Sequence, residues 1–406
     1  MYDLAAFWAW AEFAVRWVHV ITAIAWVGSS FYFIALDLGL HRDRNLASGA
    51  DGEEWQVHGG GFYHVQKYLV APDNMPDGLV WYKWESYSTW LSGFAMLVLV
   101  YYLGAEFYLI DPAVMELTGF QAALISMASL AVGWIVYNTL CKVFVDANQT
   151  GLMVALFVVL VAMSWFYTQV FSGRAALLHL GAFTATIMSG NVFWIIIPNQ
   201  KVVVADLIAG KKPDAKYGKI AKQRSTHNNY LTLPVIFLML SNHYPLSFAT
   251  EWNWLIAALV FLMGVTIRHY FNTIHARGGN PHWTWGATTV LFLIIMWLST
   301  APIPASVDAM GERATRFAQA DGFEDAVQIV QGRCSMCHAA EPAWDGLLWA
   351  PKGVLLETEA QVAHHAREIY LQAGISHAMP PANLSFMETE ERTRLIAWYQ
   401  SATQSN

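Results

Sequence analysis

The sequence predicts an all-α membrane protein: an eight-helix transmembrane bundle followed by a small soluble α-helical domain. Of its 406 residues, 56% are apolar and 13% are charged, whereas soluble domains average about 45–50% and ~25%. Between residues 14 and 300 the apolar residues form runs of ~20, long enough to cross the ~30 Å hydrocarbon core of a bilayer as helices. Residues 313–406 are polar instead. The composition and the net charge of -7 exclude a disordered chain, a nucleic-acid partner and an ordinary cytosolic enzyme.

Eight runs qualify as membrane spans. In chain order they cover residues 14–38, 89–110, 121–140, 152–171, 175–197, 230–248, 254–271 and 283–301. The sixth run is interrupted by Pro234 and Pro245, which a membrane helix tolerates when its neighbours satisfy the freed backbone groups. The proline-rich stretch at 301–305 is the expected joint. We therefore predict a transmembrane domain over residues 1–305, and a linker with a soluble domain over 306–406.

The basic residues of the loops predict the orientation of the bundle. Loops after the second, fourth and sixth spans hold only Arg174. Loops after the odd-numbered spans hold thirteen: Arg42, Arg44, Lys67, Lys83, Lys142, Lys201, Lys211, Lys212, Lys216, Lys219, Lys222, Arg224 and Arg277. Because basic loops stay inside, we expect the N-terminus and the C-terminal domain on the periplasmic side of a bacterial cytoplasmic (inner) membrane.

The strongest motif of the soluble domain is Cys334-Ser-Met-Cys337-His338. Two thiols at this spacing can bond both vinyl groups of one porphyrin, and the following imidazole can ligate the iron. A redox Cys-x-x-Cys pair or half of a zinc site is the alternative. The motif predicts one covalent haem c, and haem attachment outside the cytoplasm in bacteria agrees with the orientation taken from the loops.

The remainder of the tail supports a haem domain. Helical periodicity is present over residues 323–333, before the motif, and again over 390–399. Met379 precedes two prolines and can supply the second axial ligand, which raises the reduction potential. The competing ligands are His364, His365, His377 and Met387. Residues 334–398 resemble the small single-haem cytochrome c family.

Histidines inside the predicted spans are candidates for a second cofactor, because ionisable groups are costly there. His19 and His179 fall at similar expected depths near the outer side, and His243 is the reserve. Two imidazoles from different helices could clamp the iron of a haem b close to the haem c. The alternative is that each histidine only hydrogen-bonds a neighbouring helix.

Two cytoplasmic loops combine aromatic, amide and basic residues. The first contains His58-Gly-Gly-Gly-Phe-Tyr-His64, and the fifth ends Arg224-Ser-Thr-His227-Asn-Asn-Tyr230. Aromatic rings can stack on a planar anionic ligand, a basic side chain can neutralise its charge, and amides can form hydrogen bonds with the polar atoms at its edges. An aromatic interface belt with positive-inside charge is the alternative, but it accounts less well for the glycines, which let backbone approach a ligand closely.

These segments resemble the bacterial membrane-bound urate oxidase (urate hydroxylase) family. The resemblance rests on the two loops above, and on Trp17-Val-His19 with Trp26-Val-Gly28, Lys83-Trp84-Glu85 and Gly190-Asn191 with Pro198-Asn199-Gln200. It implies an eight-helix membrane domain followed by a cytochrome c domain. His19 with its Trp-Val-Gly turn is also similar, more distantly, to small membrane haem proteins.

The resemblance implies a role in purine catabolism: urate loses two electrons and gains water at C5, which gives 5-hydroxyisourate. The haem c would accept single electrons and pass them to a soluble cytochrome c or a terminal oxidase. A base is needed for this reaction, and His227 or His64 is our candidate because a histidine can take a proton at neutral pH. The alternatives are another membrane cytochrome c oxidoreductase, such as a quinol or small-molecule dehydrogenase, and a haem-bearing transporter or sensor.

Overall fold

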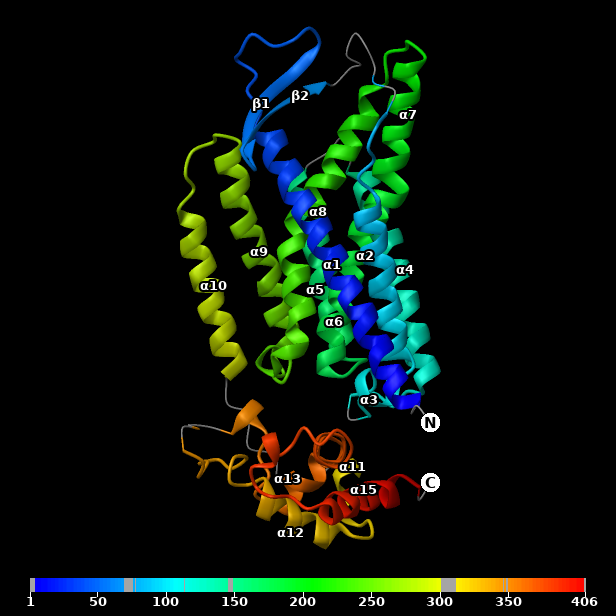
Figure 1. Cartoon of the computed structure of the whole chain (residues 1–406), viewed down its shortest axis with the longest axis vertical. Helices are drawn as coiled ribbons and strands as arrows, with labels where there is room; N and C mark the ends of the chain where they lie inside the picture. Colours follow the sequence, from blue (N-terminus) through cyan, green and yellow to red (C-terminus); the bar gives the residue numbers. More distant parts are fainter. Residues whose placement is uncertain are drawn as a thin grey trace. The chain divides into compact units, whose positions relative to one another are not determined.

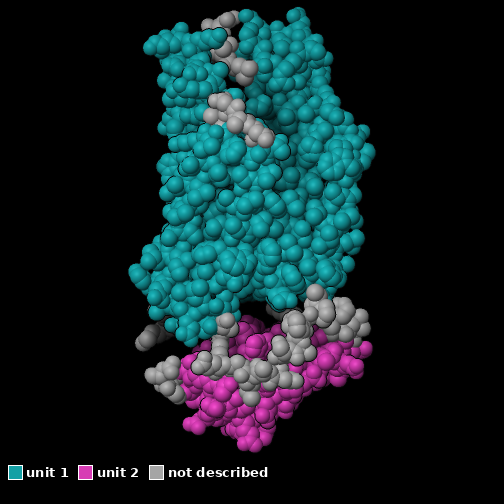
Figure 2. All heavy atoms as spheres, turned by 180° about the vertical axis from the view of Figure 1, so that it is seen from behind, with its two compact units in different colours: residues 1–301 teal, residues 302–406 magenta. Residues whose placement is uncertain are grey.

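The computed structural model describes residues 4–68, 76, 78–112, 114–144, 149–300, 312–345, 347 and 350–404. The chain divides into two compact units, Met1–Ala301 and Pro302–Asn406 (Figure 2). We call them unit 1 and unit 2. The expected joint at 301–305 lies outside the described residues.

Unit 1 is built almost entirely of helices (Figure 1). Its α-helices are α1 (Leu4–Gly39), α2 (Trp84–Met96), α3 (Ala105–Tyr108), α4 (Gly119–Val143), α5 (Gln149–Thr168), α6 (Gly173–Gly190), α7 (Ile197–Ile208), α8 (Ala215–Leu240), α9 (Asn253–His275) and α10 (Trp283–Thr300). Two π-helices, η1 (Leu97–Tyr102) and η2 (Asn191–Ile196), continue α2 and α6, and two 3₁₀ turns, η3 (Ser241–His243) and η4 (Pro245–Ser247), follow α8.

Six helical segments of the described chain are long and apolar enough to cross a membrane. They are Trp10–Gly39, Gly119–Val143, Gln149–Thr168, Gly173–Ile208, Asn253–His275 and Trp283–Thr300. These six confirm the matching predicted spans. The predicted span at 89–110 is divided among α2, η1 and α3. The helix that contains the start of the predicted span at 230–248 is longer than expected, because α8 begins at Ala215 with a basic first half.

Contacts between the helices fix their directions. His19 of α1 lies beside Thr89 and Ser92 of α2, while Phe33 near the other end of α1 packs on Tyr82 before α2 begins. The two helices therefore run antiparallel. In the same way α8 runs antiparallel to both α6 and α9, between which it packs. A helix with two packed sides can bury polar groups only where the neighbours supply polar partners.

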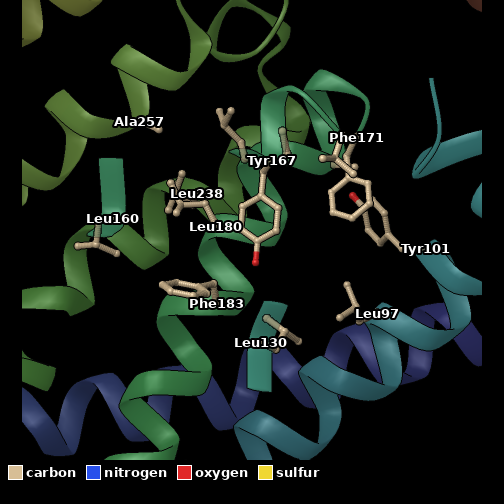
Figure 3. Close-up of a cluster of buried hydrophobic side chains, with 14 of the residues drawn as sticks. Leu97, Tyr101, Leu130, Leu160, Tyr167, Phe171, Leu180, Phe183, Leu238 and Ala257 are labelled. Carbon is tan, nitrogen blue, oxygen red and sulfur yellow. The ribbon is translucent and has the colours of Figure 1, made fainter. Parts of the chain in front are cut away.

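The core of unit 1 is aromatic and aliphatic. Tyr167 of α5 and Phe183 of α6 lie fully buried beside Leu180 and Leu238 (Figure 3). The Tyr167 hydroxyl lies 2.7 Å from Ser129 Oγ of α4, so its polar end is satisfied. Because lipid tails are as apolar as leucine, van der Waals packing and interhelical hydrogen bonds hold such a bundle together.

Unit 1 also contains a β-hairpin, which corrects the prediction of an all-α fold. Strands β1 (Ala50–His58) and β2 (Gly61–Tyr68) pair antiparallel, with Trp55 opposite His64. Gly59 and Gly60 form the turn with φ values of 57° and 80°, a left-handed conformation that glycine adopts without strain. The glycines expected to approach a ligand therefore close a turn, where added Cβ atoms at 59 and 60 would meet open space.

Unit 2 is a small helical domain. Its helices are α11 (Glu312–Ala318), α12 (Phe323–Arg333), α13 (Glu359–His364), α14 (Ala366–Ile369) and α15 (Thr389–Gln404), with shorter turns η5 (Pro351–Gly353), η6 (Tyr370–Ile375) and η7 (Pro381–Asn383). The helices predicted over 323–333 and 390–399 are confirmed by α12 and α15. Trp398 of α15 is buried, and its Nε1 donates to the Phe317 carbonyl of α11 at 2.9 Å.

Candidate functional site

A run of polar residues on α8 lies inside unit 1. The structure places Arg224, His227, Asn228 and Asn229 on this helix, with exposed fractions of 2%, 8%, 5% and 0%. The prediction that these residues end a cytoplasmic loop is therefore wrong. Hydropathy favours a loop here, but polar partners on α4, η2 and α9 let the helix stay buried.

Arg224 is the centre of the first polar cluster. Its Nη2 donates to Asn138 Oδ1 of α4 at 2.8 Å, and its Nη1 donates to Asn191 Oδ1 of η2 at 3.2 Å. The guanidinium carbon lies 5.0 Å from the ring centroid of Tyr137. Its Nε is buried and has no hydrogen-bond partner among the described residues. The group thus retains one donor for a ligand.

Asn191 connects three helices at the start of the π-helix η2, and π-helical turns occur often at functional sites. Its Nδ2 donates to Tyr137 Oη at 2.8 Å and to Asn228 Oδ1 at 2.9 Å. The neighbouring Gly190 allows this approach, because a Cβ there would lie 2.6 Å from the Trp134 ring. The glycine therefore brings α4 and η2 close enough to share the amide.

His227 completes the cluster. Its Nδ1 lies 2.9 Å from Tyr137 Oη and 4.0 Å from Cys141 Sγ. Its Nε2 has no hydrogen bond among the described residues. No local pattern connects Tyr137 or Cys141 to His227, since both lie within an apolar run about ninety residues earlier.

The charge of this cluster is not balanced. Within the described part of the chain, Arg224 forms no ion pair with a carboxylate, and its acceptors are amide oxygens. A buried cation without an anion costs several kcal/mol, on the order of the desolvation penalty of one ion. An anionic ligand at the unpaired Nε would remove that cost.

A second cationic cluster lies on the opposite side of α8. Arg268 of α9 is 5% exposed and donates through Nε and Nη2 to Asn229 Oδ1 at 3.2 and 3.1 Å. Its Nη2 also donates to Asn272 Oδ1 at 2.9 Å. Its guanidinium carbon lies 4.1 Å from the ring centroid of Phe31 on α1. This cluster joins α1, α8 and α9.

Comparison with known proteins identifies the unit that contains these clusters. Residues 5–299 match the family described as urate oxidase N-terminal. The chain belongs to this family. No curated protein and no solved structure is similar enough to count as a match. Membership of the urate oxidase N-terminal family indicates a urate-related oxidoreductase, and its six apolar helices are compatible with a multi-pass membrane protein.

His64, the other candidate base in this urate oxidase family member, lies in a different environment from His227. It stacks on Trp55 within the hairpin, with ring centroids 4.2 Å apart and planes inclined by 7°. Its Nε2 lies 2.8 Å from Glu53 Oε2. All these partners belong to the hairpin, whereas the partners of His227 belong to α4. The structure does not bring His64 and His227 together.

His19 and His179 also have separate environments. His19 Nδ1 lies 3.0 Å from the Thr89 carbonyl and 3.1 Å from Ser92 Oγ. The ring of His179 instead packs on Tyr101, with centroids 5.7 Å apart. Ser92 of α2 and Tyr101 of η1 are nine residues apart along this continuous helix, which corresponds to about 13 Å along its axis. The structure thus gives His19 and His179 different neighbours, and a haem b iron shared by the two imidazoles stays a prediction.

His179 itself is fully buried. Its Nδ1 donates to the Ala175 carbonyl at 2.8 Å, and its Nε2 has no partner in the part of the chain that the structure describes. Phe171 and Tyr167 cover the ring at centroid distances of 4.6 and 5.8 Å. The reserve residue, His243, lies in the exposed turn η3.

In unit 2 the residues of the Cys-x-x-Cys-His motif fit a covalent haem. Cys334 follows the last residue of α12, and its carbonyl accepts from the backbone N–H of Cys337 at 3.1 Å and of His338 at 2.9 Å. His338 Nδ1 lies 2.9 Å from the Val354 carbonyl. A histidine that donates through Nδ1 presents Nε2 to a metal. Burial raises the pKa of the Cys334 thiol to about 12.

The candidates for the second axial ligand differ in burial. Met379 is half-buried at the edge of the unit 2 core, and its carbonyl accepts from Arg392 Nη1 at 2.9 Å. Met387 is 3% exposed within that core. His365 stands against His364, and burial lowers its pKa to about 4. The assignment of Met379 stays a prediction.

The described residues contain no group of three or more histidine, cysteine, aspartate or glutamate side chains that could hold a metal ion. The candidate iron ligands are therefore the individual histidines and methionines named above.

Proposed function

We propose that unit 1 oxidises urate to 5-hydroxyisourate within the membrane, and that unit 2 accepts the electrons through a covalent haem c. One observation carries the proposal: in a chain of the urate oxidase N-terminal family, the buried Arg224 has no anionic partner among the described residues and keeps an unpaired Nε donor. Urate is a planar anion with acceptor atoms on its edges, and it matches that donor in charge and shape.

The reaction balances without oxygen. Urate and one water give 5-hydroxyisourate, two electrons and two protons. Loss of electrons makes C5 electrophilic, so that water can add there. Arg224 would hold the anion, while the half-buried Asn138 and the buried Asn191 fix the direction of its guanidinium. His227 Nε2, which has no partner among the described residues, would contact the same ligand.

Cys334, Cys337 and His338 would hold the haem c, with Met379 as the proposed second axial ligand. The bound haem supplies a one-electron acceptor, so two transfers are needed for each urate. A soluble cytochrome c or a terminal oxidase would take the electrons onward. A haem b held by His19 and His179 stays a candidate second cofactor, since His179 Nε2 is buried without a partner among the described residues.

The eight-span arrangement is part of this proposal. The helix formed by α2 and η1 and the helix α8, whose polar residues face neighbouring helices, would add two crossings to the six apolar segments. Eight crossings, with the basic loops in the cytoplasm, put both the N-terminus and the haem domain in the periplasm of a bacterial inner membrane. That compartment is where covalent haem attachment takes place in bacteria.

Spectroscopy of the purified full chain tests the proposal. Urate added without oxygen should reduce two equivalents of haem c for each urate consumed, read from the ferrous haem bands and the loss of urate absorbance. Arg224→Gln should weaken urate binding by at least tenfold, since a hydrogen bond to a charged group contributes about 1.5–3 kcal/mol. Thr226→Ala, which alters a half-buried position of the same helix, is the matched control. Neither haem reduction nor urate loss in the wild type would reject the proposal.

A further inference from the structure

The hydrogen bonds that lead from Arg224 to His227 run in one direction. A guanidinium can only donate, a backbone carbonyl can only accept, and an amide side chain does each at a different atom. The guanidinium of Arg224 and the carbonyl of Met188 stand at the two ends of this hydrogen-bond network. Together they determine the orientation of each amide side chain between them.

Asn191 is fixed from both sides. Arg224 Nη1 must donate to it, so the atom 3.2 Å away must be Asn191 Oδ1. On the other side, Asn228 must direct Nδ2 at the Met188 carbonyl, 2.9 Å away. Asn228 can then only accept from Asn191 through Oδ1, so Asn191 must donate to it through Nδ2, at 2.9 Å. Both ends require the same orientation of the Asn191 amide.

The orientation of the Asn191 amide determines the direction of the hydrogen bonds at the Tyr137 hydroxyl. Asn191 Nδ2 donates to Tyr137 Oη at 2.8 Å, so the phenol accepts there. Its single hydrogen remains for His227 Nδ1, 2.9 Å away. The competing acceptor is Cys141 Sγ, which also contacts the phenol, but thiol sulfur is a weaker acceptor than an imidazole nitrogen. The phenol therefore donates to the imidazole.

We infer that Asn191 and Tyr137 are positioning residues that hold neutral His227 in the tautomer with its proton on Nε2. An imidazole that accepts at Nδ1 must carry its hydrogen at Nε2. His227 then offers a hydrogen-bond donor to the bound anion, in place of the lone pair that a general base needs. This inference rests on the proposed function, because the ligand is taken to be urate.

The consequence is a rule for the ligand. Arg224 Nε and His227 Nε2 are both donors without partners among the described residues. The ligand atoms that face them must be acceptors, such as a carbonyl oxygen or a deprotonated ring nitrogen. A purine with an amino group at that place would put donor against donor and leave buried groups unpaired, a penalty of about 1–3 kcal/mol for each.

The tautomer can be measured directly. Full-length protein labelled with ¹⁵N histidine, with no urate present, is compared with His227→Gln to assign the His227 signals. We expect a protonated Nε2 and an unprotonated Nδ1 for His227. In Tyr137→Phe, and independently in Asn191→Asp, both tautomers should appear. Tyr167→Phe removes a buried phenol that contacts Ser129 instead, and it should leave the His227 signals unchanged. A protonated Nδ1 in the wild type would overturn the inference.

Urate binding provides the second readout, by equilibrium dialysis of the same proteins. His227→Gln can still donate near the Nε2 position and should bind within about threefold of wild type, whereas His227→Glu presents an anion and should lose at least a hundredfold. Equal binding by both variants would contradict the donor role. Wild-type protein that binds no urate rejects the proposed function, yet the ¹⁵N spectrum still decides the tautomer.

Discussion

Gly264 of α9 lies so close to Pro234 of α8 that a Cβ at position 264 would be 2.5 Å from the Pro234 Cδ. Both residues are buried. Proline inside a helix lacks an N–H and pushes the chain aside, and the glycine provides the space that the ring occupies. This contact is one to two turns from the Asn229–Arg268 pair on the same two helices.

Gly264→Ala should therefore destabilise unit 1. A methyl group at this contact forces α8 and α9 apart, and such overpacking costs about 1–3 kcal/mol. Thermal unfolding of the protein in detergent should show a lower Tm. Gly286→Ala on α10 is the matched control, because its Cβ meets nothing within 4 Å. An unchanged Tm for Gly264→Ala would contradict the prediction, because it would show that α8 and α9 can move apart without loss of stability.

Asp37 is expected to hold the hairpin to the bundle. This half-buried carboxylate at the end of α1 pairs with Lys67 of β2 and with Lys222 Nζ of α8, the latter at 2.9 Å. Burial and the charge of Lys222 lower the pKa of Lys67. Asp37→Asn leaves two lysines to repel each other, so trypsin should cut at Lys67 sooner than in wild type. Glu251→Gln at an exposed position is the control, and equal cleavage rates would contradict the prediction.

Glu391 should make unit 2 sensitive to acid. Its burial acts to raise its pKa, but hydrogen bonds from Arg333 and from the Glu388 backbone outweigh this, and the pKa of Glu391 lies below its ordinary value. A carboxyl group with a depressed folded-state pKa adds stability above its unfolded pKa of about 4.3, and this contribution disappears as the pH falls through the folded value.

Hydrogen exchange of α12 and α15 in the full chain measures this effect. Protection should be greater at pH 7 than at pH 3 in the wild type, and Glu391→Gln should remove part of that difference. Glu390→Gln, at a more exposed carboxylate that pairs with Arg394 at 3.2 Å, should retain it. The prediction is wrong if both variants respond to acid as the wild type does.

The haem content of the purified chain should include one c-type haem. His338 has the hydrogen bond that directs Nε2 toward an iron, whereas His19 and His179 contact different residues of α2 and η1. A pyridine haemochrome spectrum separates the two types. Cys334→Ala/Cys337→Ala should abolish haem staining in a denaturing gel while urate binding to unit 1 persists. The prediction fails if the wild type shows no c-type signal, and a b-type signal would support the second cofactor.

Hydrophobic periodicity predicted those elements that have one apolar face or a long apolar run. The six apolar segments and the α12 helix follow from such patterns. The hairpin could also have been found, because Gly59-Gly60 is a hairpin-turn signal and has Trp55 and Val57 before it and Phe62, Tyr63 and Val65 after it.

The first half of α8 could not be predicted in this way. Arg224 and Asn228 read as loop residues because their partners lie far away in the sequence, on α4 and η2. Burial of such a segment is a property of the assembled bundle and leaves no local pattern. For the same reason, the link between Tyr137 and His227 became visible only in three dimensions.

The polarity of α8 has a consequence for how the protein is made. A cationic residue at the centre of a membrane helix costs about 2.5–3.5 kcal/mol during insertion, and α8 carries Arg224 after three lysines in its first half. It cannot partition into lipid by itself from the translocon. Since α4, α6 and η2 precede α8 in the chain, they are available to receive it as it emerges, and α9 follows and packs against it. Truncation after α8 should yield a chain that membrane quality-control proteases degrade.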